Sequence, residues 1–75
     1  MPIEKLRVYY NAEYNITRAA LNAPNHGITR EGLWNTVQRG VGASYIAQML
    51  GAKEEEVLPL YEDFKTKIMS LEELL

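Results

Sequence analysis

The chain contains no cysteine and only one histidine, His26. Small domains that bury little apolar surface often depend on disulfides, on a bound metal or on self-association for their stability. The absence of cysteine excludes a disulfide and a thiolate zinc site, and a single histidine excludes a histidine cluster. The 75 residues are enough for one domain. The sequence therefore predicts one domain over residues 1–75 that needs no cofactor and no metal, and for which self-association is the remaining source of added stability.

Apolar side chains recur every three or four residues near both ends of the chain, which is the spacing of one face of an α-helix. The first stripe predicts a helix over residues 3–22 and consists of Ile3, Leu6, Tyr10, Tyr14, Thr17 and Leu21. Alternating Leu6, Val8 and Tyr10 would also suit a strand, but the sequence offers no second strand as its partner. The last stripe predicts a helix from about residue 53, with a heptad-like spacing of Val57, Tyr61, Phe64, Ile68, Leu71 and Leu75. Ser70 could instead begin a separate short helix.

The middle of the chain contains several turn signals. Residues 22–27 predict a loop, and a second helix is expected over residues 28–39 with Thr29 as its N-cap. The side chains of this helix that are expected to face inward are Leu33, Trp34 and Val37. Gly40-Val41-Gly42 is predicted to end the helix, and a short third helix is expected over residues 43–50, capped by Gly51. In that third helix, the side chains expected to be buried are Ile46, Ala47 and Leu50. The resulting prediction is an all-α fold, a small four-helix domain.

Residues 39–57 read Arg-Gly-Val-Gly-Ala-Ser-Tyr-Ile-Ala-Gln-Met-Leu-Gly-Ala-Lys-Glu-Glu-Glu-Val. This segment resembles the helix-turn-helix of small transcriptional regulators, sigma-type factors and transposase N-terminal domains. The features in common are Gly40-Val41-Gly42, Ile46-Ala47-Gln48-Met49-Leu50-Gly51 and Val57. The resemblance implies a helix-turn-helix-like core and a small DNA-binding regulatory protein of the type found in phages and mobile elements. In such proteins the second helix of the motif lies in the major groove of DNA.

Charge is distributed unevenly along the chain. Residues 1–45 carry five basic and three acidic side chains, whereas residues 46–75 carry three basic and seven acidic ones. If DNA is bound, the residues expected to contact its backbone are Arg30, Arg39, Ser44, Gln48 and Lys53. The would-be recognition helix, however, begins with three consecutive glutamates, which would repel phosphates. Pro59 also falls early in that helix and tends to kink it.

An acidic protein-interaction module that binds or inhibits a protein partner is therefore the alternative prediction. The candidate partner-binding residues are Glu54, Glu55, Glu56, Tyr61, Phe64, Ile68 and Leu71. The three glutamates would equally suit the positive start of the last helix without any partner. The C-terminal stripe has two interpretations as well. It could pack on the core of its own chain, or it could form a homodimer through a helix extension over residues 68–75.

Several function classes are not expected. No apolar run reaches the roughly 18–20 residues of a membrane span, and the N-terminus lacks the apolar centre of a signal peptide, so a cytoplasmic protein is expected. No nucleophile–base pair, phosphate-binding loop or metal-ligand cluster is present in the sequence. We therefore expect a binding protein and not an enzyme.

Overall fold

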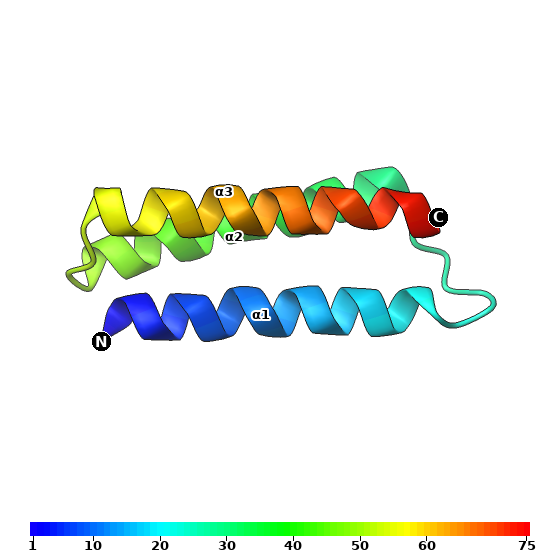
Figure 1. Cartoon of the computed structure of the whole chain (residues 1–75), viewed down its shortest axis with the longest axis horizontal. Coiled ribbons are helices and arrows are strands. Elements are labelled where there is room, and N and C mark those ends of the chain that lie inside the picture. The colour runs from blue at the N-terminus through cyan, green and yellow to red at the C-terminus, as the bar shows by residue number, and fades with distance from the viewer.

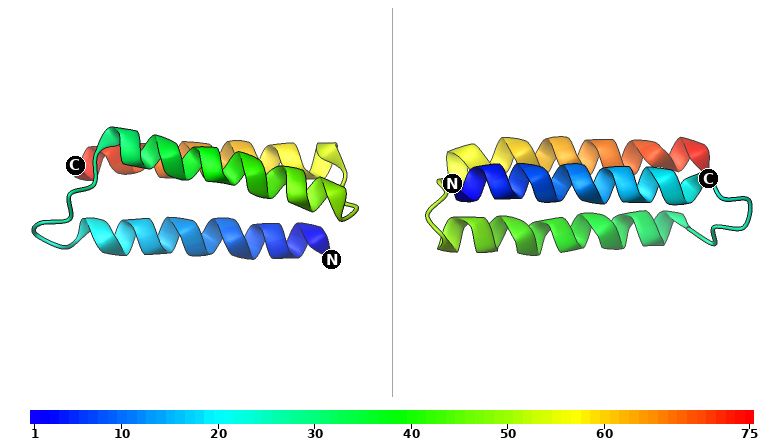
Figure 2. Two further views of the ribbon diagram at one scale, coloured as in Figure 1. Left: turned by 180° about the vertical axis from the view of Figure 1, so that it is seen from behind. Right: turned by 90° about the horizontal axis from the view of Figure 1, so that it is seen from below.

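The computed structural model describes residues 1–75 and contains three long α-helices. These are α1 (Pro2–Leu21), α2 (Arg30–Met49) and α3 (Glu54–Ser70), and a short 3-10 helix, η1 (Leu71–Leu74), follows α3. The helices lie side by side, and α2 runs in the opposite direction to α1 and α3 (Figures 1 and 2). The bundle measures 41 × 16 × 15 Å. The predicted all-α fold is confirmed. α1 and the start of α3 lie within a residue or two of their predicted positions, whereas α3 ends at Ser70, before the last residues of the predicted stripe.

Local chemistry explains where the helices begin and end. Pro2 lies in the first turn of α1, where its missing N–H is not needed. The loop that follows α1 contains Gly27 in the left-handed conformation, with φ of +66°. In the same loop, Nδ1 of His26 accepts a hydrogen bond of 2.8 Å from the backbone N–H of Ile28. Thr29 caps α2, as predicted, by accepting a hydrogen bond of 3.2 Å from the N–H of Gly32.

The predicted division of residues 28–50 into two helices is wrong. α2 continues through Gly40 and Gly42 to Met49 without a break, so the count of four α-helices becomes three. Each glycine costs a helix about 1 kcal/mol relative to alanine, but tertiary packing outweighs this cost. Gly40 is buried, and its lack of a side chain lets two aromatic rings approach the helix backbone. At the other end, a separate short helix does follow Ser70, namely η1, as the alternative prediction had it. The Ser70 hydroxyl does not cap η1, however, because it donates to the carbonyl of Lys67.

The segment that resembles a helix-turn-helix forms the second half of α2, a tight turn and the start of α3. Gly51 makes the turn, with φ of +112°. α2 and α3 then run antiparallel along their lengths (Figure 1), whereas the helices of a DNA-binding helix-turn-helix meet at about 90–120°. The structure therefore does not confirm a helix-turn-helix core.

The core is made by apolar residues from all three helices and from η1. Its members are Leu6, Tyr10, Leu21, Leu33, Val37, Ala47, Val57, Phe64, Ile68 and Leu71. At its centre the rings of Tyr10 and Phe64 stack with centroids 4.3 Å apart, and the hydroxyl of Tyr10 donates a 2.8 Å hydrogen bond to the carbonyl of Gly40. Trp34, expected to face inward, is 42% exposed and lies beneath the ammonium group of Lys65. None of the helices combines the length and the apolar content that crossing a bilayer would require.

Because Tyr10 is buried, the free energy of unfolding is expected to fall at alkaline pH. Loss of hydration, together with the nearby Tyr61 and Tyr9, raises the pKa of Tyr10 to about 12 from its usual value of 10. Between these values the unfolded chain releases the phenolic proton and the folded chain retains it, so the free energy of unfolding falls as pH rises. We expect a loss of at most about 2.7 kcal/mol between pH 10 and 12. Urea unfolding measured from pH 9 to 12 tests this, with Tyr10→Phe as the control. An equal loss in Tyr10→Phe would contradict the prediction.

Candidate functional site

An apolar groove of about 470 Å³ runs between α1 and the second half of α2, and we call it the α1–α2 groove. α1 lines one side with Lys5, Leu6 and Tyr9, which fall on one face of that helix. α2 lines the other side with larger residues, Ile46 and Leu50, and with smaller ones, Gly42, Ala43 and Ala47. The small residues leave space beside α2, and Ile46 and Leu50 remain 60% and 66% exposed. The groove is therefore open to solvent along an apolar surface.

The charged groups that line the groove are both cations. Lys5 comes from α1 and Arg39 from α2, and no carboxylate lines the groove. Lys5 is exposed and makes no ion pair, since the three ion pairs of the structure involve other residues. An acidic group that entered the groove would therefore meet the unpaired ammonium group of Lys5 on one side and, on the other, the guanidinium group of Arg39, which also pairs with Glu13.

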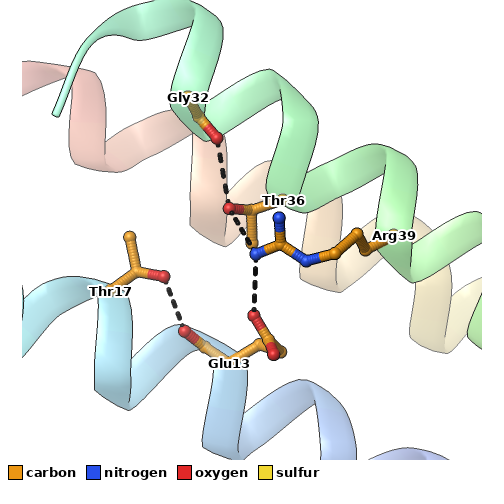
Figure 3. A network of polar contacts seen from close by, with 5 residues as sticks. All are labelled: Glu13, Thr17, Gly32, Thr36 and Arg39. Carbon is orange, nitrogen blue, oxygen red and sulfur yellow. Dashed lines mark hydrogen bonds and ion pairs between the residues drawn. The ribbon is translucent and has the colours of Figure 1, made fainter.

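A small polar network holds Arg39 in place (Figure 3). Its Nη2 atom lies 3.3 Å from a carboxylate oxygen of Glu13 on α1 and 3.2 Å from the hydroxyl of Thr36 on α2. The Thr36 hydroxyl in turn donates to the carbonyl of Gly32, and the Thr17 hydroxyl donates to the carbonyl of Glu13. All of the Arg39 contacts use Nη2, and the side chain is 58% exposed. Its Nε and Nη1 groups thus remain as donors for a bound partner.

The basic residues predicted to contact DNA do not share one face. Arg30, at the start of α2, pairs with Glu72 at 3.2 Å, while Arg39 pairs with Glu13 on α1. These two arginines therefore lie on opposite sides of α2, and Lys53 lies at the other end of the bundle from Arg30 (Figure 1). Ser44 is buried, and its hydroxyl donates to the carbonyl of Val41. Gln48 is half-buried.

The residues predicted to bind a protein partner are also separated from one another. Phe64, Ile68 and Leu71 are buried in the core of their own chain, so a partner cannot touch them while the bundle is closed. Tyr61 is half-buried, and the exposed glutamates Glu54, Glu55 and Glu56 lie at the start of α3. Of the proposed extension over residues 68–75, Leu74 and Leu75 expose about half of their surface.

The sequence pattern does not reveal the groove, because a helix that ends at Gly40 places Ile46 and Leu50 of the next predicted helix in the core. Of the three side chains predicted to be buried in residues 43–50, only Ala47 is buried. The two residues can be placed correctly only if residues 30–49 are treated as one continuous helix, because the buried positions then follow a single helical spacing. Along α2 the buried face steps by four, three, four and three residues through Leu33, Val37, Gly40, Ser44 and Ala47. Ile46 and Leu50 fall outside that series, and this would have placed them on the surface.

No family model, curated protein or solved structure matches the chain. No group of three or more His, Cys, Asp or Glu side chains is positioned to hold a metal ion. The choice of function therefore depends on the shape, exposure and charge of the surface, and the α1–α2 groove is the feature that combines all three.

Proposed function

We propose that the chain is a protein-interaction module that binds a partner protein in the α1–α2 groove. The observation that carries the proposal is the exposure of Ile46 and Leu50 beside the apolar lining of the groove. Contiguous exposed apolar surface on a small protein is typical of an interaction site. Lys5 also borders a shallow hollow near the N-terminus, which is lined by Met1, Glu4 and Val8 as well. A partner that covered Ile46 and Leu50 would remove them from water, which is the main source of affinity in protein complexes.

Capture of partners from the cells that make this protein tests the proposal. Ile46→Glu places a charge in the groove and is expected to lower partner recovery by at least about tenfold. Ile16→Glu is the matched control, because Ile16 is similarly exposed, lies on α1 and does not line the groove. It is expected to leave recovery unchanged. The interaction role would be contradicted if Ile46→Glu and Ile16→Glu recovered the same proteins, or if the parent chain recovered none.

DNA binding is a second proposal, supported by the resemblance of residues 39–57 and by the exposed cations Arg39 and Lys53. A DNA-binding protein would shift duplex DNA in an electrophoretic assay at low salt, and its affinity would fall steeply as salt rises. Absence of a shift at low salt would remove this proposal. The separation of Arg30 from Arg39 on α2 makes it the weaker of the two, because these two predicted phosphate contacts lie on opposite sides of that helix.

A further inference from the structure

We infer that the occupant of the α1–α2 groove is a single amphipathic helix of another protein, with acidic side chains directed at Lys5 and Arg39. This inference rests on the interaction role proposed above and adds the chemical class of the partner. Charge complementarity is its first support. Lys5 on one side of the groove makes no ion pair, Arg39 on the other keeps Nε and Nη1 free beside its pair with Glu13, and no carboxylate belongs to the lining. The groove therefore favours a partner segment whose apolar face is bordered by aspartate or glutamate.

The shape of the groove is the second support. Gly42, Ala43 and Ala47 project little from α2, and a Cβ added at Gly42 would meet no atom within 4 Å. Helix axes approach most closely where the contacting side chains are small. From Arg39 to Leu50 the groove follows α2 for about 16 Å, which is about three turns of a helix. A partner helix of this length presents apolar side chains at positions i, i+4 and i+7, and its docking would complete a four-helix arrangement.

A second copy of the chain fits the groove less well than an acidic helix. In a two-fold dimer the same surface of each copy meets its counterpart. Lys5 and Arg39 would then face the same cations across the interface, and like charges brought together cost binding energy. Of the acidic residues of this chain, Glu13 already pairs with Arg39 of its own copy, and Glu54, Glu55 and Glu56 lie at the start of α3, away from the groove.

Two synthetic helical peptides test the inference with the full chain. Both carry leucine at positions i, i+4 and i+7, and they differ only in flanking glutamates or lysines. By fluorescence anisotropy we expect the glutamate peptide to bind about tenfold more tightly at low salt, and the difference to shrink as salt rises. Lys5→Glu leaves one cation and one carboxylate in the groove and should remove the preference, whereas Arg18→Glu, an exposed site on α1 outside the groove, should preserve it. Gly42→Leu fills the groove and should weaken the glutamate peptide by at least about tenfold.

The remaining outcomes overturn the inference. These are equal binding of the two peptides, preference for the lysine peptide, and no binding of either one. Self-association in sedimentation experiments that Ile46→Glu abolishes would assign the groove to a second copy and would also overturn it. None of these results affects the interaction role, provided that Ile46→Glu still loses a partner captured from cells. If Ile46→Glu recovers the same partner proteins from cells as the parent chain, the proposed interaction role is wrong, regardless of how the two peptides bind.

Discussion

Ile68→Asp is expected to unfold the chain. Ile68 has no exposed surface and lies in the core near the end of α3. An unpaired carboxylate in such a place costs several kcal/mol, either as buried charge or as the work of keeping it protonated. Small domains have total stabilities at the lower end of about 5–15 kcal/mol. Far-UV circular dichroism should therefore show loss of most of the helical signal at neutral pH and 25 °C.

Leu74→Asp is the matched control for this substitution. Leu74 belongs to the same C-terminal segment but is 52% exposed, so the variant should keep its helical signal and its urea midpoint should change little. The pair also separates the two interpretations of the C-terminal stripe. If Ile68 served only a dimer interface, Ile68→Asp would give a folded monomer, and that result would contradict the structure.

Gly40→Leu is expected to lower the free energy of unfolding by about 3 kcal/mol or more. A Cβ at Gly40 would lie 2.6 Å from Cε2 and 2.9 Å from Cδ2 of Phe64, and 3.3 Å from Cε1 of Tyr10. Both rings are buried and stacked on each other, so neither can move without displacing the other. Extra methylenes in a filled core cost about 1–3 kcal/mol and sometimes more, and leucine adds three further carbons beyond Cβ.

Gly42→Leu isolates this steric cost. Gly42 lies in the same helix, only two residues away, and faces open space. Both substitutions raise helix propensity by about 1 kcal/mol, so this contribution cancels, and the collision of the Gly40→Leu side chain with Phe64 and Tyr10 should make that variant the less stable of the two in urea unfolding. Equal stabilities for the two variants would show that the rings can yield, and the packing described for Gly40 would then be wrong.

The outer helices could be predicted from the sequence because each carries an unbroken apolar stripe. α2 could not, because Gly40 and Gly42 are local signals for a helix end and their effect is reversed by contacts with other helices. Gly40 is tolerated because Tyr10 and Phe64, thirty residues before it and twenty-four after it, pack against its backbone. The spacing of residues over a short stretch of sequence does not reveal contacts with residues that are twenty or more positions away.

The candidate site was harder to predict for a related reason. Splitting α2 at Gly40 removed the helical phase that places Ile46 and Leu50 on the surface, so both were counted as core. Lys5 and Arg39 come from different helices, and only the packing of α1 on α2 brings them to the same groove. Conversely, the heptad-like spacing of the last stripe made Phe64 and Ile68 candidates for partner contact, but the same spacing suits packing within the chain, and the bundle buries both in its own core.

The close approach at Gly40 has a geometric consequence for the whole bundle. Long helices that meet through smooth apolar faces can slide along one another, and a shift of one turn is about 5.4 Å. Such a shift would bring the Tyr10 and Phe64 rings against Val37 or Ser44, whose side chains occupy the space that glycine leaves empty. The missing side chain at Gly40 thus fixes how far α1 and α3 are shifted along α2, because only this position has room for the two rings. The position of α1 along α2 sets which residues of α1 lie opposite Ala43 and Ile46. Gly40 therefore also determines where the groove lies and which charged residues line it.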